Sequence, residues 1–175
     1  MVLGRRAFLT VLGASALGST AGCLGRERVV PADETDAEWP SVPSIVNVPE
    51  DAHTVTTHVV GHRGLDDVLA GEPIGVVVAN GANSSTEVTI SIERRDLFSW
   101  TSLYDGRHGL AAPTRIDFIL RNPATYRIRL STPDHEAEKQ IPESDFDCND
   151  KAYSLVVTDE EIAQSSISTT AGCGF

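Results

Sequence analysis

The stretch "STEVTISIERR", residues 85–95, decides the fold class because its polar and apolar residues alternate one by one. In an extended chain, successive side chains point to opposite faces, so Val88, Ile90 and Ile92 share one face. The stretch "TYRIRLS", residues 125–131, repeats the pattern with an aromatic and two aliphatic residues. Both stretches therefore predict β-strands with one buried face and one wet face.

Outward from these two stretches, most of the chain after residue 52 is strand-like, with many Val, Ile and Thr residues between turn signals. The turn signals are "NGANSS" at 80–85, Asp105-Gly106 and "RNPA" at 121–124. Only Leu65 to Ala70 favours a short helical turn, and no α/β alternation is present. We therefore expect an antiparallel β-sandwich. Its predicted strands are 54–60, 74–80, 86–94, 98–104, 115–120, 125–130, 152–158 and 162–168.

The first 22 residues have the organisation of a secretion signal. A short basic start with Arg5 and Arg6 precedes an apolar run of about fifteen residues, shorter than the roughly 20 that span a bilayer as a helix. The arginine pair followed by Phe8 and Leu9 resembles the twin-arginine export motif. We therefore expect the chain to be exported.

The tetrapeptide "TAGC" at 20–23 resembles a lipobox, in which a signal peptidase cuts before the cysteine and the thiol carries a lipid. Thr20 stands where a lipobox usually has Leu. The resemblance implies that Cys23 is the lipidated N-terminus of the mature chain. Ordinary cleavage of a secreted protein, with Cys23 incidental, is the alternative.

The composition is strongly acidic. The chain carries a net charge of −11, and the part from residue 23 onward keeps all 25 acidic residues but only 12 of the 14 basic ones, for a net charge of −13. Nucleic-acid phosphates would be repelled by such a surface, so we expect no nucleic-acid partner. Lysine occurs only at Lys139 and Lys151.

An acidic, lysine-poor chain behind a twin-arginine lipobox leader resembles the exported lipoproteins of salt-loving archaea. That resemblance implies a halophilic protein anchored through lipid at the extracellular face of the cell membrane. The segments "LRNPATYRIRL" and "DCND", followed by an aliphatic strand and a terminal cysteine, are similar to the immunoglobulin-like modules of such lipoproteins. The implied fold is an immunoglobulin-like β-sandwich.

Three regions follow from these patterns. Residues 1–22 are predicted to be the signal peptide, and residues 53–175 the sandwich domain. Residues 23–52 between them contain four prolines and many charges without an apolar period, which predicts a disordered, extended linker. Trp39 is the one large apolar group in this linker, and we expect it to dock on the flank of the domain.

Cys148 and Cys173 bracket a predicted hairpin from Lys151 to Thr170. A hairpin brings its two ends together, as a disulfide requires, and an exported protein meets oxidising conditions. Once Cys23 is assigned to lipid, these are the remaining thiols. We therefore expect a disulfide between them, with two free buried cysteines as the alternative.

Metal sites are weakly supported by the sequence. A blue-copper site is excluded in its usual form, because the sole methionine is Met1 and no histidine follows Cys148. On a strand, His58 and His62 would lie about 13 Å apart and His53 would face the other way, so joint chelation is not expected. We expect neither a metal nor a cofactor.

Two further sites are weaker candidates. Asp145, Asp147 and Asn149 are spaced like the start of a calcium loop, but the Gly and the bidentate Glu of such a loop are missing, so a solvated acidic loop is the default and weak cation binding the alternative. Asn83 begins a glycosylation sequon in a predicted turn.

No catalytic motif is present: the chain has no Gly-x-Ser-x-Gly elbow, no His-Glu-x-x-His pair and no phosphate-binding loop beside a helix. We therefore expect a non-enzymatic surface module that is structural or binds an unknown surface protein or envelope component. A small-ligand or cation-binding accessory lipoprotein is the first alternative, and a cryptic hydrolase is the second.

Overall fold

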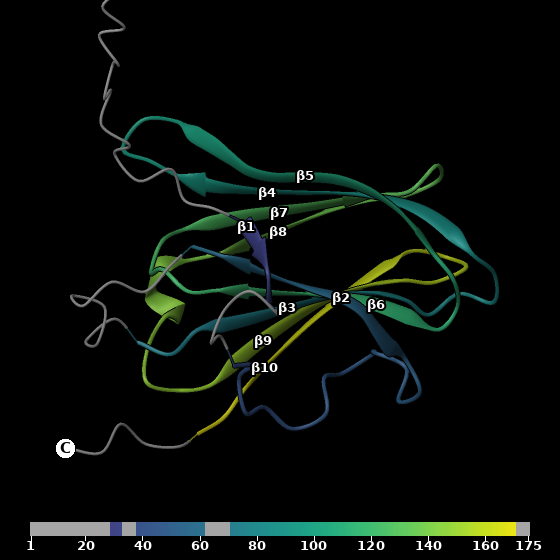
Figure 1. Cartoon of the computed structure of the whole chain (residues 1–175), viewed down its shortest axis with the longest axis horizontal. Helices are drawn as coiled ribbons and strands as arrows, with labels where there is room; N and C mark the ends of the chain where they lie inside the picture. Colours follow the sequence, from purple (N-terminus) through teal and green to yellow (C-terminus); the bar gives the residue numbers. More distant parts are fainter. Residues whose placement is uncertain (1–28, 33–37, 62–70, 171–175) are drawn as a thin grey trace, which may run out of the picture.

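Two β-sheets pack face to face in the computed structural model, which describes residues 29–32, 38–61 and 71–170 (Figure 1). The larger sheet has the strand order β1-β2-β6-β3-β9-β10, and the smaller has the order β5-β4-β7-β8. The expected sandwich of two sheets is confirmed. The strands are β1 (Val29–Pro31), β2 (His53–Val60), β3 (Ile74–Asn80), β4 (Thr86–Arg95), β5 (Trp100–Leu110), β6 (Thr114–Leu120), β7 (Tyr126–Ser131), β8 (Glu136–Ile141), β9 (Lys151–Val157) and β10 (Ile162–Ser168), with a 3-10 turn at Glu143–Asp145.

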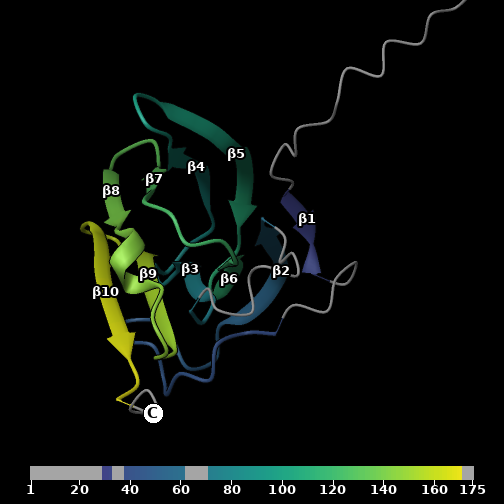
Figure 2. The same ribbon diagram turned by 90° about the vertical axis from the view of Figure 1, so that its left-hand side faces the viewer.

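The main core lies between the two sheets, which Figure 2 shows end-on as two layers. The predicted alternation of β4 holds, because Val88, Ile90 and Ile92 are fully buried there. The aromatic and aliphatic residues of β7 enter the same cluster from the neighbouring strand, and Phe118 and Leu155 meet them from the larger sheet. Burial of these side chains is the main stabilising contribution to the fold.

A second, smaller cluster lies on the outer face of the larger sheet. Val77, Ala79 and Val156 are buried there beneath Trp39, Ile45 and Val48. This outer layer explains why every residue of β3 is buried, whereas β4 alternates.

Glycine at position 75 allows Trp39 to lie against β3. A Cβ atom at Gly75 would stand 2.7 Å from two ring carbons of Trp39, closer than any real contact. The layer is also hydrogen-bonded, since the hydroxyls of Ser154 and Ser165 both donate to the backbone carbonyl of Val46. The expected docking of Trp39 on the domain is therefore observed.

These contacts bear on the predicted linker. The described part of residues 23–52 contains β1, which pairs with β2 at the edge of the larger sheet, and the layer that holds Trp39. Both lie on the sandwich rather than extending away from it, so the expectation of a disordered spacer is wrong for these residues. The boundaries drawn at residues 22 and 52 stay predictions.

The strand directions differ from the prediction in two places. β2 pairs with β6, and β3 pairs with β9, in parallel, while the other pairings are antiparallel. Hairpin reasoning sets the direction of strands that follow one another in the chain, but these partners are separated by three or more strands. Their direction is therefore decided by tertiary packing.

Strand boundaries also differ in instructive ways. Asp105-Gly106, predicted as a turn, lies inside β5, where both residues pair with β4. A Cβ at Gly106 would stand 2.6 Å from the hydroxyl of Tyr104, so this glycine serves a close approach rather than a turn. β8 was missed because only Ile141 of its six residues is buried. The helical turn expected at Leu65 to Ala70 lies outside the described residues.

No helix among residues 29–32, 38–61 and 71–170 is long and apolar enough to cross a membrane.

Candidate interaction site

The turn between β4 and β5 presents two large apolar side chains to solvent. Leu97 is 89% exposed and Phe98 is 98% exposed, the highest values among the large hydrophobic residues that the structure describes. The other exposed ones, Val46 and Val55, stand singly elsewhere. An adjacent exposed pair of this size is the type of surface feature that marks a contact site.

Hydrogen bonds hold this turn in one shape. The backbone N–H of Asp96 donates to the carbonyl of Ser99 across 2.8 Å and closes the turn. The Asp96 carboxylate accepts a hydrogen bond from the hydroxyl of Thr101 and forms an ion pair with Arg94 at 3.2 Å. The Thr101 hydrogen bond and the charge of Arg94 lower the pKa of Asp96. Asp96 therefore stays ionised and organises the turn.

Trp100, at the start of β5 directly after the turn, contacts two arginines. The guanidinium carbon of Arg127 lies 4.2 Å from the centre of the Trp100 ring, and that of Arg95 lies 5.8 Å away. Cation–π attraction of this kind contributes about 0.5–1 kcal/mol at an exposed site. The indole therefore links the start of β5 to the arginines of β4 and β7.

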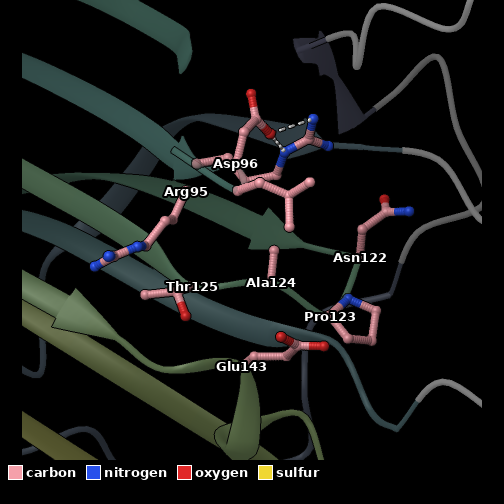
Figure 3. A pocket seen from close by; sticks show the side chains of 9 residues that line it. Arg95, Asp96, Asn122, Pro123, Ala124, Thr125 and Glu143 are labelled. Atoms are coloured by element: carbon pink, nitrogen blue, oxygen red, sulfur yellow. Dashed lines mark hydrogen bonds and ion pairs between the residues drawn. The ribbon is translucent and has the colours of Figure 1, made fainter. Parts of the chain in front are cut away.

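A surface pocket of about 470 Å³ opens beside the turn (Figure 3). The connection between β6 and β7 forms its opposite wall, and Tyr126 fixes this connection because its hydroxyl donates to the carbonyl of Asn122 across 2.9 Å. The N–H of Arg95 donates to the carbonyl of Thr125 and joins the two walls. The pocket is lined by Arg94, Arg95, Asp96, Leu97, Asn122, Pro123, Ala124, Thr125 and Glu143.

Sequence reasoning missed this site. The stretch "DLFSW" lacks the Gly, Pro and Asn residues that mark turns, so its Phe98 was assigned to a strand. An apolar pair directly after two arginines and an aspartate was the available signal.

A second cluster brings His58 of β2 together with Tyr104 and His108 of β5. The Tyr104 hydroxyl and His108 Nε2 lie 2.6 Å apart in a hydrogen bond, and the His58 ring stacks on Phe118 with centres 5.3 Å apart. Burial, and for His58 also the charge of His108, lowers the pKa of both histidines. The described residues contain no group of three or more His, Cys, Asp or Glu side chains that could hold a metal ion.

The outer face of the larger sheet carries a buried carboxylate that the sequence did not single out. Asp117 accepts a hydrogen bond from Thr54 at 2.9 Å and pairs with Arg115 at 3.3 Å. Its other oxygen, Oδ1, is buried without a hydrogen-bond partner. Burial raises the pKa of Asp117 above its ordinary value.

The carboxylates of the acidic loop before β9 form ion pairs with a lysine, Lys151, at the start of that strand. Lys151 Nζ lies 2.8 Å from Asp147 and 3.5 Å from Asp145, and Asp147 also accepts the backbone N–H of Asn149. The hydrogen bond from Lys151 lowers the pKa of Asp147. Lys151 is thus the cation that these two carboxylates hold, and weak metal binding by Asp145, Asp147 and Asn149 stays a prediction.

Asn83 is exposed in the connection between β3 and β4, where the sequon was expected. Its side-chain amide donates to Asp159 in the turn between β9 and β10, and its backbone N–H donates to the same carboxylate at 3.3 Å. Asn83 is accessible to a glycosylating enzyme, but glycosylation would compete with this hydrogen bond. Its use stays a prediction.

The predicted hairpin between the two C-terminal cysteines is confirmed, because β9 and β10 pair antiparallel from Lys151 to Ser168. The pairing extends to a hydrogen bond from Thr169 N–H to the carbonyl of Asp150. Cys148 is disulfide-bonded, but its partner lies outside the described residues, so pairing with Cys173 stays a prediction. Arg5, Arg6, Phe8, Leu9, Cys23 and His62 also lie outside the described residues.

Comparisons with known proteins give little further information. No protein-family model matches the chain, and no curated protein matches it. A solved structure described as "Crystal Structure of Gram Negative Toxin" is similar to 58% of this chain at 12% identity, with a TM-score of 0.28, and the similar part spans 24% of that protein. A likeness this low carries no argument about fold or function.

Proposed function

We propose that this chain is an exported lipoprotein, anchored through Cys23 at the extracellular face of the membrane, whose immunoglobulin-like sandwich acts as a structural or protein-interaction module. The twin-arginine and lipobox features of residues 1–23 support the export and the anchor. The acidic composition supports a halophilic setting, in which concentrated salt screens the repulsion between carboxylates.

The arrangement of the central strands supports the immunoglobulin-like assignment. The antiparallel pair β3–β6 faces the sheet β5-β4-β7-β8, as strands B and E face strands C′, C, F and G of a variable-type immunoglobulin domain. Tyr126, at the start of β7, donates its hydroxyl to a backbone carbonyl four residues upstream. This hydrogen bond resembles the tyrosine corner at the start of strand F in that fold.

The observation that carries the proposed role is the filled interior. Twenty buried residues, nineteen from the two sheets and Phe146 from the connection between β8 and β9, form one continuous cluster between the layers. A sandwich packed with its own side chains offers a partner its loops and exposed sheet edges, as a structural or interaction module does.

The test begins with the anchor. We expect Cys23→Ser to move the protein from the membrane fraction to the medium, or to leave an uncleaved precursor. Cys148→Ser is the control for loss of a cysteine, because it opens the disulfide without touching the lipobox and should leave attachment unchanged. Mature Cys23→Ser protein that remains in the membrane fraction would contradict the anchor. Capture of the native lipoprotein from membranes in high salt then identifies its partner.

The pocket beside the β4–β5 turn favours a second candidate, an accessory lipoprotein that binds a small anionic ligand. Its volume of about 470 Å³ is within the range of ligand sites, and Arg95 could attract an anion. A rise in the unfolding temperature with millimolar acetate, lost in Arg95→Gln, would support this candidate. An equal rise in both proteins would exclude it.

A further inference from the structure

We propose that Leu97 and Phe98 insert into the bilayer that carries the lipid anchor, so that the sandwich rests on the membrane with its β4–β5 end down. This inference rests on the proposed anchor at Cys23 and names the surface that the apolar turn contacts.

The first argument is the short distance between the anchor and the sandwich. Only five residues separate Cys23 from Val29, the first residue of β1. At 3.6 Å or less per residue, these six steps span at most about 22 Å. Because β1 belongs to the larger sheet, the effective tether is short, and a lipid at Cys23 keeps the Val29 end of the sandwich close to the headgroups.

The second argument is that Val29 and the apolar turn belong to the same end of the molecule. Val29 pairs with Val60, which pairs with Leu120 at the end of β6. The chain continues from Leu120 into the β6–β7 connection, which forms one wall of the pocket whose other wall contains Leu97. Figure 1 shows the β4–β5 and β6–β7 connections at the left end of the sandwich. The tether from Cys23 therefore attaches to the end of the sandwich that exposes Leu97 and Phe98.

The third argument is the chemistry of the turn itself. An aliphatic and an aromatic residue at the tip supply apolar area for the acyl region, and Trp100 stands behind them with an amphipathic ring suited to the interface. Arg95 is exposed beside them and forms no ion pair among the described residues, so it is available to a lipid phosphate. Asp96 is already neutralised by Arg94 and adds little repulsion.

The fourth argument is the contrast with the opposite end. The turns there, between β7 and β8 and between β9 and β10, expose the carboxylates of Asp134, Asp159, Glu160 and Glu161. The end with Leu97 also carries carboxylates, but Lys151 pairs with Asp145 and Asp147, and Arg94 pairs with Asp96. Glu143 remains exposed in the pocket wall. The orientation therefore rests on the tether and the apolar pair, and charge makes the smaller contribution.

The test uses the lipidated full-length mature protein in vesicles of equal phosphatidylglycerol and phosphatidylcholine, with bromine on the acyl chains. Tryptophan is introduced by Phe98→Trp, and by Val46→Trp and Val55→Trp as controls at the other exposed hydrophobic positions. Bromine quenches only tryptophans that reach the acyl region. We expect the fluorescence added by Phe98→Trp to be quenched severalfold and that added by the two controls to be unchanged.

Two further substitutions in the Phe98→Trp protein measure how much Leu97 and Arg95 contribute to the insertion. Leu97→Ser should lower the inserted fraction about tenfold, because it removes an exposed aliphatic side chain that insertion would transfer to the acyl region. Arg95→Gln should lower it about fivefold on these vesicles and leave it unchanged on pure phosphatidylcholine.

The outcomes distinguish a failure of the membrane insertion from a failure of the lipid anchor. Mass spectrometry of the N-terminal peptide establishes whether Cys23 carries lipid. A lipidated protein whose Phe98→Trp fluorescence is quenched no more than that of Val46→Trp overturns the insertion and leaves the anchor in place. A native protein that mass spectrometry finds without lipid at Cys23 refutes the anchor, and quenching of its Phe98→Trp variant added to the same vesicles would still support the insertion. A turn that contacts a protein instead would give no quenching, which also overturns the inference.

Discussion

The outer faces of the two sheets are covered in different ways. On the larger sheet, Trp39, Ile45 and Val48 bury the middle of β3 and β9 under a second apolar cluster. On the smaller sheet, the outer face is a charged network in which Arg127 lies 2.6 Å from Glu93, and Arg129 bridges Glu93 at 3.3 Å and Glu138 at 2.9 Å. One face gains stability from the burial of apolar side chains, and the other gains it from ion pairs.

This difference explains the contrast between β3 and β4 in the sequence. β4 alternates because one of its faces is wet, whereas β3 reads "IGVVVAN" because both of its faces are buried. A continuous apolar strand in an otherwise alternating sheet therefore indicates that another part of the chain covers it. Here, that part comes from the segment that composition alone assigned to a linker.

The largest test of this comparison uses the two tryptophans, one on each outer face. We expect Trp39→Ala to lower the free energy of unfolding by about 3 kcal/mol, because it opens a cavity over Gly75. Trp100→Ala is the matched control and should cost about 1 kcal/mol, the value of its contacts with the arginines. Denaturant unfolding measures both. Equal losses would mean that the outer layer adds no more than the charged face.

The second test addresses the charged face. Glu93→Gln should cost about 1 kcal/mol at low salt, since Glu93 and Arg127 are both more than four-fifths buried as side chains. Molar salt should shrink this cost, because it screens the attraction. Glu87→Gln breaks the more exposed pair with Arg107 at 3.6 Å and should change the unfolding free energy very little. A Glu93→Gln cost that is independent of salt would argue against an electrostatic origin.

The smallest test uses the opposite pKa shifts of two carboxyl groups, one on each face. Burial raises the pKa of Asp117, so its ionisation opposes folding, and stability is lost as the pH rises above 3.8 through the folded-state pKa. The hydrogen bond from Arg129 lowers the pKa of Glu138, so its ionisation favours folding, and stability is lost as the pH falls below 4.5 through the folded-state pKa.

Asp117→Asn and Glu138→Gln should therefore diverge when unfolding is followed from pH 3 upward. Relative to the unsubstituted protein, Asp117→Asn should become more stable as the pH rises, and Glu138→Gln should become less stable. If the stability of both variants changed with pH in the same direction, relative to the unsubstituted protein, the proposed difference between the two faces would be wrong.

Much of the fold was predictable from local pattern. β3 and β10 were predicted with their observed bounds, and β4 and β7 with their observed buried faces, because alternation depends only on the geometry of an extended chain. β1 and β8 were not predictable, since both are edge strands with little burial. Their residues show no apolar alternation, and they are held in the sheets by backbone pairing with β2 and β7. The candidate site was missed for a related reason: Leu97 and Phe98 resemble strand residues until Asp96 closes the turn around them.

By itself, the sequence determined the strand pattern and the acidic composition, because both depend only on residue types and their spacing along the chain. Its resemblance to lipoprotein leaders added the expectation of an exported, lipid-carrying N-terminus. The tertiary structure decided which strands are parallel, which face Trp39 covers and which end of the sandwich holds both Val29 and the exposed apolar turn. These features depend on residues far apart in the chain, whose contacts form only when the whole sandwich packs. The orientation proposed for the protein on its membrane depends on the second set of features.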